Sequence, residues 1–442
     1  MAEPDSGKSK ITSRGIMEDA KARLTETVAP HEEILELLAG KVKKINFNTL
    51  AGVPQDEEVP IWKLNVIAVD EILRLTRQYH WGLCKNKEFI YLYNGAYWFN
   101  LDGEQLMTFL GEVSHKLGVP ALRSRHYEFR KKLVSQFHAV ANMPAPVSHS
   151  GKTLINLLNG TLEIDGGNFL LRPFNRDNFL TYQLPFSYDP EANAPVFQNY
   201  LKTVLPHEEL SDILAEYIGY LFIPNNTLKL EKTILLYGVG ANGKSVFFDI
   251  INALLGRVNV STYSLQSLTD KSGYYRAMIG NKLVNYASEI NRKLDPTLFK
   301  QLVSGEPIEA RLPYGQPFIL DKYAKLIFNT NELPKDVEHT NAYFRRFIII
   351  PFDVVIPENK QDKNLASKII NNELPGVLNW VLEGLRRLTV NKTFTFSDIV
   401  SRQVELYKNE SDTTYLFLEE MSYVPDVNLS KPLREIYNEY KL

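Results

Sequence analysis

The chain has 442 residues, of which 44% are hydrophobic, 23% charged and 11% aromatic, so it is long enough for two to four domains with their own cores. Its 24 glycines and 23 prolines accompany ordinary hydrophobicity, which excludes collagen-like, low-complexity and wholly disordered classes. The formal net charge of −2 provides no global basic field, so any contact with nucleic acid requires local patches.

The sequence carries no sign of membrane insertion or secretion. Charged residues interrupt every apolar stretch before it reaches the roughly 18 residues that a bilayer span requires. The first residues lack the apolar core of a signal peptide, and the single cysteine, Cys84, allows no internal disulfide. These features predict a protein of a reducing cytoplasm without a membrane partner.

In the N-terminal half, some segments have clear patterns of helices and strands and others have weak ones. Residues 1–75 contain one short helical pattern and give no indication of their role. Aromatic runs around Asn94–Gly95 then predict a β-hairpin followed by a helix. Short strands around Asn159–Gly160 and helical periodicity over residues 195–222 complete a predicted α+β domain with a helical collar, residues 76–228.

The segment Arg123–Lys132 is the best basic patch of this half. It holds five positive charges against one negative, with Tyr127 and Phe129 between them. Two interpretations remain open, a solvated helix face and a surface that contacts a nucleic-acid strand.

Beyond residue 229 the pattern changes to alternating strands and helices, which is typical of an α/β unit with a mostly parallel sheet. We expect this core to occupy residues 229–358. Residues 359–442 have the pattern of a helical C-terminal segment.

The strongest motif is GVGANGKS, Gly238–Ser245, which fits the phosphate-binding pattern G-x-x-x-x-G-K-S. It follows a predicted strand, Thr233–Tyr237, and precedes a predicted helix, and this context disfavours a glycine-rich turn with an incidental lysine. Lys244 is expected to reach the β and γ phosphates of a nucleotide, and the Ser245 hydroxyl to bind Mg²⁺. The predicted nucleotide-binding residues are Gly238, Gly240, Ala241, Asn242, Gly243, Lys244, Ser245 and Val246.

Two further predicted strands end in polar side chains that an ATPase requires. Glu289 follows a strand-like run and is a candidate to hold Mg²⁺ or to activate water, although an ordinary strand-end glutamate is the alternative. Asn331 ends the run KLIFNTN and is a candidate to orient water or to sense the γ phosphate. Asn329 is the neighbouring candidate, because strand alternation puts both amides on one side.

Arg345 and Arg346 stand directly before a predicted strand, in AYFRRFIIIPF. An arginine at such an edge can be presented to ATP bound by an adjacent subunit and neutralise charge on the transferred phosphoryl group. The alternative is a solvated strand start.

The ordered motifs GVGANGKS, VNYASEI, FKQLVSGEPIEARLPYGQPF, KLIFNTNELP and FRRFIIIPF resemble the superfamily-three helicases of the AAA+ class. More closely, they resemble the helicase portion of phage, plasmid and poxvirus primase-helicases, and the upstream text resembles the domain that precedes it there. The resemblance covers about residues 80–420. It implies an AAA+ P-loop core with a central, mostly parallel sheet, after an α+β domain and helical collar.

The resemblance also implies roles, cofactors and partners. ATP and Mg²⁺ are the expected cofactors, and the expected assembly is a homo-hexameric ring on single-stranded or forked DNA. The implied roles are Lys244 and Ser245 as the Walker A pair, Glu289 as the Walker B acid, Asn331 as sensor, and Arg346 as the finger in trans with Arg345 second.

The segment between Glu289 and Asn331 predicts a hairpin with a turn at Pro313–Gly315. In the resembling helicases such a hairpin lines the central channel, which makes Arg311 and Tyr314 candidate DNA contacts, a cation for phosphate and an aromatic ring for stacking. The alternative is a hairpin packed on its own subunit, with Arg311 paired inward to Glu306 or Glu309.

Two departures from the family pattern matter. The first 150 residues contain no paired acidic motif of the D-x-D type, so we expect no primase activity on this chain. The text ends inside a predicted helix where a winged helix often follows in the family, so this protein either lacks that segment or is represented by a truncated chain.

The resulting hypothesis is an ATP-dependent DNA helicase or translocase of phage or mobile-element replication. It would act in the cytoplasm of a bacterial cell, or of the host cell if it is phage-encoded, with a separate primase or polymerase as a replication partner. Two alternatives remain, a nucleotide-gated DNA-binding initiator that assembles without unwinding, and an AAA+ ATPase that acts on protein.

Overall fold

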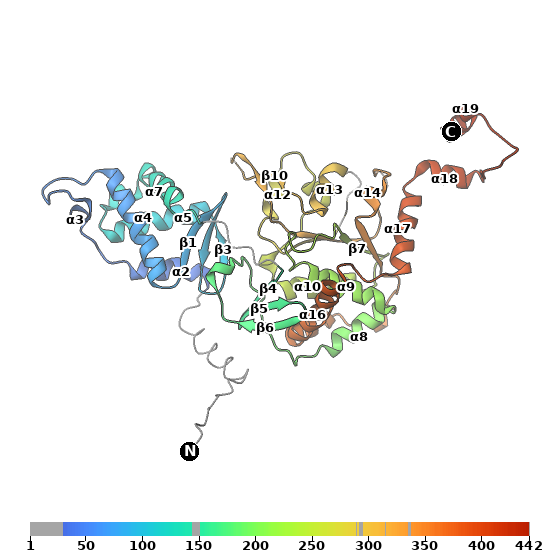
Figure 1. Cartoon of the computed structure of the whole chain (residues 1–442), viewed down its shortest axis with the longest axis horizontal. Coiled ribbons are helices and arrows are strands. Elements are labelled where there is room, and N and C mark those ends of the chain that lie inside the picture. The colour runs from blue at the N-terminus through green and yellow to red at the C-terminus, as the bar shows by residue number, and fades with distance from the viewer. Residues whose placement is uncertain are drawn as a thin grey trace, which may run out of the picture. The chain divides into compact units, whose positions relative to one another are not determined.

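A computed structural model describes residues 30–143, 151–288, 290, 295–313, 315–334 and 337–441. These residues divide between two compact units. The first comprises the chain up to Ile164 together with Asn168–Tyr188, and the second comprises Asp165–Gly167 and the chain from Asp189 onward. Figure 1 shows the elements in chain order.

The first unit packs helices against an antiparallel sheet of order β1-β2-β3. One sheet face bears Leu83 and Leu92 toward the helices, and the other buries Cys84 and Trp98, as the period of two in a strand dictates. The helices are α2 (His31–Lys41), α3 (Phe47–Ala51), α4 (Ile61–Gln78), α5 (Gly103–Leu117), α6 (Ala121–Arg125) and α7 (Tyr127–Val140), and the strands are β1 (Gly82–Asn86), β2 (Phe89–Tyr93) and β3 (Trp98–Leu101).

The predicted hairpin at Asn94–Gly95 is confirmed, since Tyr93 of β2 pairs with Trp98 of β3. A second sheet of the same unit contains β4 (Thr153–Leu157), β5 (Gly160–Asp165) and β6 (Asn168–Arg172). Its first turn differs from the prediction. Leu157 pairs with Gly160, so the turn residues are Leu158 and Asn159, and Gly160 begins β5 where the carbonyl oxygen of Arg172 leaves no room for a Cβ atom.

The second unit contains a five-stranded parallel sheet of order β13-β7-β12-β9-β8, which confirms the predicted α/β pattern. The residues of its three central strands, β7, β12 and β9, are almost all buried, as expected when helices cover both faces of a parallel sheet. The strands are β7 (Thr233–Tyr237), β8 (Val260–Ser261), β9 (Val284–Ala287), β12 (Lys325–Thr330) and β13 (Phe347–Pro351), and a separate hairpin contains β10 (Ile308–Arg311) and β11 (Pro317–Leu320).

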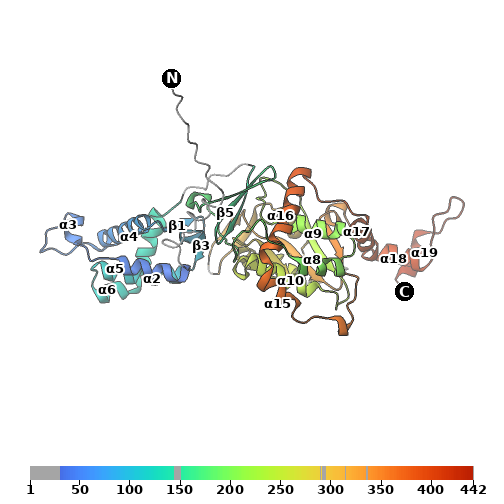
Figure 2. The same ribbon diagram turned by 90° about the horizontal axis from the view of Figure 1, so that it is seen from below.

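Helices flank this sheet on two sides. In Figure 1 α8, α9, α10 and α16 lie below it and α12, α13 and α14 above it, and Figure 2, seen from below, has the first group in front. The helices are α8 (Pro195–Val204), α9 (Glu208–Tyr220), α10 (Lys244–Leu255), α11 (Leu265–Leu268), α12 (Tyr274–Met278), α13 (Pro296–Val303), α14 (Asn341–Phe344), α15 (Leu365–Asn372), α16 (Leu374–Asn391), α17 (Asp398–Glu410), α18 (Thr413–Glu420) and α19 (Leu433–Tyr440).

Helices α9 and α16 approach closely because glycine lies at their contact. A Cβ atom on Gly384 would lie 2.4 Å from the carbonyl carbon of Ala215. Beside this contact the buried carboxylate of Glu216 accepts hydrogen bonds from the amide and hydroxyl of Thr395 at 2.7 and 2.6 Å. The helical C-terminal segment, α15 to α19, agrees with the sequence prediction.

None of the helices in the described ranges is both long enough and apolar enough to cross a bilayer.

Candidate phosphate-binding site

The predicted phosphate-binding motif forms a tight turn between β7 and α10. The strand ends at Tyr237 and the helix begins at Lys244, as predicted. Gly238, Gly240 and Gly243 have φ values of +155°, +105° and +90°, and Ala241 has φ +49°. Positive φ angles of this kind are typical of an anion-binding nest, in which successive backbone amides face one concave side.

Hydrogen bonds to elements that are distant in sequence hold this turn in place. The Gly238 amide donates to the Thr330 carbonyl oxygen at 3.2 Å, and the Asn242 side-chain amide donates to the Phe352 carbonyl oxygen at 2.7 Å. The Tyr200 hydroxyl of α8 donates to the Gly243 carbonyl oxygen at 2.8 Å. Burial raises the pKa of Tyr200, which keeps this hydroxyl a donor. Sequence patterns did not indicate these supports, because only the fold brings them to the loop.

Two glycines are required by close contacts. A Cβ atom on Gly238 would lie 2.4 Å from both the Asn242 side-chain nitrogen and the Phe352 carbonyl oxygen, and one on Gly243 would lie 2.8 Å from Val204. Gly240 has no neighbour within 4 Å of such an atom. The turn is therefore packed at its ends and open at its tip.

The open side of the turn presents hydrogen-bond donors. Among the described residues, no acceptor is assigned to the backbone amides of residues 239–246. Lys244 is buried, with 6% of the residue exposed. Its side-chain ammonium donates to the Gly238 carbonyl oxygen at 2.5 Å and to Asn242 Oδ1 at 3.1 Å. Burial lowers the pKa of Lys244, and a bound anion would favour its charged form. Free amides, a helix N-terminus and a lysine fit a phosphate group.

Two predicted site residues, Glu289 and Tyr314, lie outside the described residues. Strand β9 ends at Ala287, and in the sheet it is the neighbour of β12. Within the described ranges no cluster of three or more His, Cys, Asp or Glu side chains could hold a metal ion. Of the two residues predicted to bind Mg²⁺, Ser245 and Glu289, Ser245 is the one that the structure describes, and it is exposed.

The structure separates the two asparagine candidates by burial. Asn329 lies within β12, is 7% exposed and accepts a hydrogen bond from the Tyr286 hydroxyl at 3.0 Å. Asn331 follows β12 and is exposed. The Thr330 carbonyl oxygen accepts a hydrogen bond from the Gly238 amide, and this contact joins β12 to the predicted phosphate-binding turn. Asn331 is the next residue in the chain, so it lies beside this contact.

The two arginines before β13 have different environments. Arg346 is 8% exposed, and its guanidinium donates to the Ser304 hydroxyl at 2.9 Å and to the Ala342 carbonyl oxygen. Its side chain also lies 3.7 Å from the Glu231 carboxylate. The Arg345 side chain is 60% exposed and pairs with Glu231 at 2.8 Å. Arg345 is therefore the arginine that faces solvent.

The predicted hairpin is confirmed as β10 and β11, with Arg311 opposite Pro317. Arg311 is exposed, donates to the Gly315 carbonyl oxygen at 2.9 Å and lies 5.9 Å from the centre of the Tyr274 ring. Among the described residues it makes no ion pair with Glu306 or Glu309.

The basic segment Arg123–Lys132 divides between core and surface. Phe129 is 3% exposed, whereas Tyr127 is 60% exposed with the Lys131 ammonium 5.1 Å from its ring centre. Arg123 pairs with Glu58. Arg125, Tyr127, Lys131 and Lys132 are exposed and form a surface of cations around one aromatic ring, which leaves both interpretations of the segment open.

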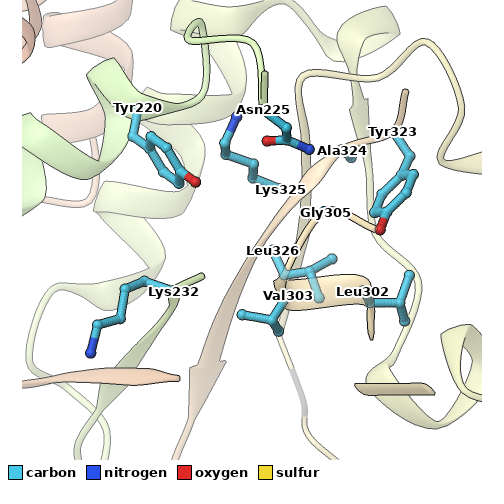
Figure 3. A pocket seen from close by; sticks show the side chains of 10 residues that line it. All are labelled: Tyr220, Asn225, Lys232, Leu302, Val303, Gly305, Tyr323, Ala324, Lys325 and Leu326. Carbon is cyan, nitrogen blue, oxygen red and sulfur yellow. The ribbon is translucent and has the colours of Figure 1, made fainter. Parts of the chain in front are cut away.

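A small cavity lies at the amino-terminal edge of the sheet (Figure 3). With a volume of about 10 Å³ it holds no more than a water molecule. Lys325 lines this cavity and is half-buried as a whole residue. Its ammonium lies 4.3 Å from the Tyr220 ring centre and donates to the Ile223 carbonyl oxygen at 2.8 Å. Burial lowers the pKa of Lys325 to about 7.

Comparisons with known proteins match two parts of the sequence. Residues 71–206 match the family described as D5 N terminal like, and residues 236–346 match a family of unknown function, DUF5906. The first match overlaps most of the segment expected to resemble the domain before the helicase, and the second contains the predicted phosphate-binding turn and the arginine pair.

Two viral proteins, each named "Putative helicase", are similar to this chain. One, from Acanthamoeba polyphaga mimivirus, is 24% identical over 216 residues, and the other, from Invertebrate iridescent virus 6, is 27% identical over 238 residues. The matches cover 45% and 48% of this chain but 22% and 24% of the relatives, so the chain spans less than a quarter of their length. The chain thus has viral relatives that are named as helicases.

Solved structures of the NrS-1 C terminal region also match. Two of them are 13% and 14% identical to this chain, with TM-scores of 0.49 and 0.48. The first match covers 87% of this chain and 86% of the other, and the second covers 84% of each.

Substitution of the two loop glycines by alanine should have unequal effects. Gly238→Ala places a methyl group against the Phe352 backbone and the Asn242 amide, whereas Gly240→Ala strains only the backbone. We expect Gly238→Ala to be the more destabilising by roughly 1–3 kcal/mol. Urea unfolding of the two variants measures this difference, and equal free energies of unfolding would contradict the described loop.

The buried ammonium of Lys325 should make stability depend on pH. Because its native pKa is about 7 and the ordinary value is 10.5, the unfolded chain binds more protons between these pH values. The wild type should therefore gain stability relative to Lys325→Met as pH rises through this range, and the full penalty should persist below about pH 7. Unfolding midpoints of both proteins across the range test this, and parallel pH profiles would refute it.

Proposed function

We propose that this chain is an ATP-dependent DNA helicase or translocase that acts in the replication of a virus, phage or other mobile element. The observation that carries the proposal is the strand, turn and helix at Gly238–Ser245, which combines the Lys244 ammonium with backbone amides that have no acceptor assigned among the described residues. The viral relatives named as helicases support the same reading.

The proposed core is of the AAA+ type, with its catalytic groups at the carboxyl edge of the parallel sheet. Strand β7, which leads into the turn, lies between β13 and β12, and β12 lies beside β9. Since parallel strands end at the same edge, Lys244, Asn331 and Glu289 follow three strands that end close together. This order supports a shared site for the three residues.

In this site the amides of the turn and Lys244 bind the β and γ phosphates, and the Ser245 hydroxyl with Glu289 holds Mg²⁺. The metal, when bound, neutralises charge on the phosphates. Asn331 orients the attacking water. Glu289, which follows the end of β9 by two residues, is also the candidate base.

The arginine finger of the proposed assembly acts in trans. Arg345 and Arg346 precede β13, which has five residues, so about 16 Å of strand separates them from the edge that bears the turn. They are therefore available to a nucleotide on a neighbouring subunit rather than to their own. A ring, for which we propose a hexamer, satisfies this geometry at every interface.

We propose Arg345 as the finger. Its side chain is mostly exposed, and an ion pair at the surface, such as the one with Glu231, is worth about 0–1 kcal/mol, so Arg345 is released at little cost. Arg346 would have to leave buried partners on its own subunit, and it is better suited to fixing the start of β13. This ranking reverses the one that the resemblance implies.

Single-stranded or forked DNA is the proposed substrate, gripped at the tip of the β10–β11 hairpin. Arg311, held above Tyr274, offers a cation for backbone phosphate, and Tyr314 offers a ring at the turn. A separate primase or polymerase is the proposed replication partner.

The first test is ATP turnover by the full chain with and without single-stranded DNA, together with displacement of a strand from a fork. DNA should raise the ATPase rate several-fold, and Lys244→Ala should abolish turnover because the phosphate cation is lost. Turnover that DNA does not change would favour an ATPase acting on protein. Binding to a fork without strand displacement would favour an assembly switch.

The second test is complementation between two inactive variants. Lys244→Ala removes the phosphate lysine of its own site, and Arg345→Ala should abolish turnover while nucleotide binding stays within about twofold of the wild type. A mixture should recover part of the activity, because some interfaces join an intact turn to an intact arginine. Arg346→Ala is the matched control, expected to lower stability rather than to complement. An Arg345→Ala protein with normal turnover would refute the assignment.

A further inference from the structure

A second cavity lies in the same unit, between the loop that joins α8 to α9, the end of β13 and α17. Its volume is about 320 Å³, within the range of about 300–1,000 Å³ for small-molecule sites. Its floor is apolar and buried, with Val204 at 1% and Leu210 at 2% exposure. Arg402, Gln403 and Leu406 of α17 form the opposite wall.

This cavity adjoins the phosphate-binding turn. Val204, which lines it, is also the residue that a Cβ atom on Gly243 would touch at 2.8 Å. On another side, the Phe352 carbonyl oxygen accepts from Asn242, and Phe352 stands between two lining residues, Pro351 and Asp353. Because Pro351 pairs with Tyr237 in parallel strands, cavity and turn lie at the same edge of the sheet.

The lining has the chemistry of a site for a flat heteroaromatic ring. Val204 and Leu210 supply apolar contact, and the Arg402 guanidinium can stack on a ring face. The Gln403 side chain donates and accepts at once, which matches the amino group and ring nitrogen of adenine. Guanine presents two acceptors at the corresponding edge and leaves the Gln403 carbonyl oxygen without a donor.

We propose that this cavity binds the base of the nucleotide whose phosphates lie at Gly238–Ser245, and that Gln403 selects adenine over guanine. The inference rests on the proposed nucleotide site and adds the specificity of that site. His207 and Asp353, exposed at the cavity's rim, are then placed to meet the ribose hydroxyls.

The test separates base from phosphate by comparing ADP with inorganic pyrophosphate, both in the presence of Mg²⁺. Leu406→Trp fills the cavity from a half-exposed position. It should weaken ADP binding to the full chain at least tenfold and leave pyrophosphate binding unchanged. Glu405→Trp adds the same bulk to the same helix outside the lining, and it should change neither affinity.

A milder variant tests selection without a change in bulk. Gln403→Ala should weaken ADP about tenfold, the loss of one bidentate base contact, and GDP much less, so that the ratio of the two affinities falls. Thermal unfolding of each variant verifies that it is folded.

The outcomes distinguish the inference from the proposal on which it rests. Wild-type ADP affinity in both variants, or an equal loss of ADP and pyrophosphate, would overturn the base site while the phosphate site stands. A wild-type chain that binds neither ADP nor pyrophosphate would overturn both.

Discussion

The turn from β7 into α10 depends on hydrogen bonds to residues that are distant in sequence. A backbone that points its amides toward an anion has few contacts within itself, so its shape comes from the Thr330 and Phe352 carbonyl oxygens and the Tyr200 hydroxyl. Helix α8, which carries Tyr200, is fixed in turn by Glu373, whose carboxylate accepts from the amides of Val196 and Phe197 at 3.1 and 2.9 Å. The shape of the proposed anion site therefore depends on several elements of the second unit and not on the eight-residue motif alone.

The parallel sheet gives its two edges different chemistry. The carboxyl edge bears Lys244 and backbone amides without an acceptor in the described part of the chain, whereas the amino edge has charged groups, with Arg345 and Lys229 around the Glu231 carboxylate. A sheet of this kind cannot bring both edges to one ligand, since its strands separate them. In the proposed assembly a second copy supplies the missing edge, so each interface would unite the two chemistries. Lys325 also lies at the amino edge, and its burial there lowers its pKa because burial disfavours the charged ammonium.

Features encoded locally could be predicted from the sequence. The motif at Gly238–Ser245 fixes strand, turn and helix by spacing alone, and the β10–β11 hairpin follows from its turn residues. Features set by distant contacts could not. Ser304 binds Arg346 across 42 positions, and nothing in FRRF shows that one arginine is buried and the next exposed. Likewise, alternation could not separate Asn329 from Asn331, because the Tyr286 hydroxyl that engages Asn329 comes from another strand. The turn before Gly160 was misplaced by one residue because pairing register, not turn composition, decides where β5 begins.

Helix α17 contacts both the cavity proposed to bind the base and the segment that leads to the arginine pair. One side of it lines the cavity beside the phosphate-binding turn, with Gln403 and Leu406. On another side Tyr407 packs its ring 5.3 Å from that of Phe344 and places its hydroxyl 3.4 Å from the Tyr343 hydroxyl, directly before the arginine pair. A base bound against α17 would thus contact the same helix that supports the segment leading to Arg345. Such coupling cannot exceed the difference in nucleotide affinity between two positions of α17. The helix therefore transmits binding only if the base contacts it more favourably in one of those positions.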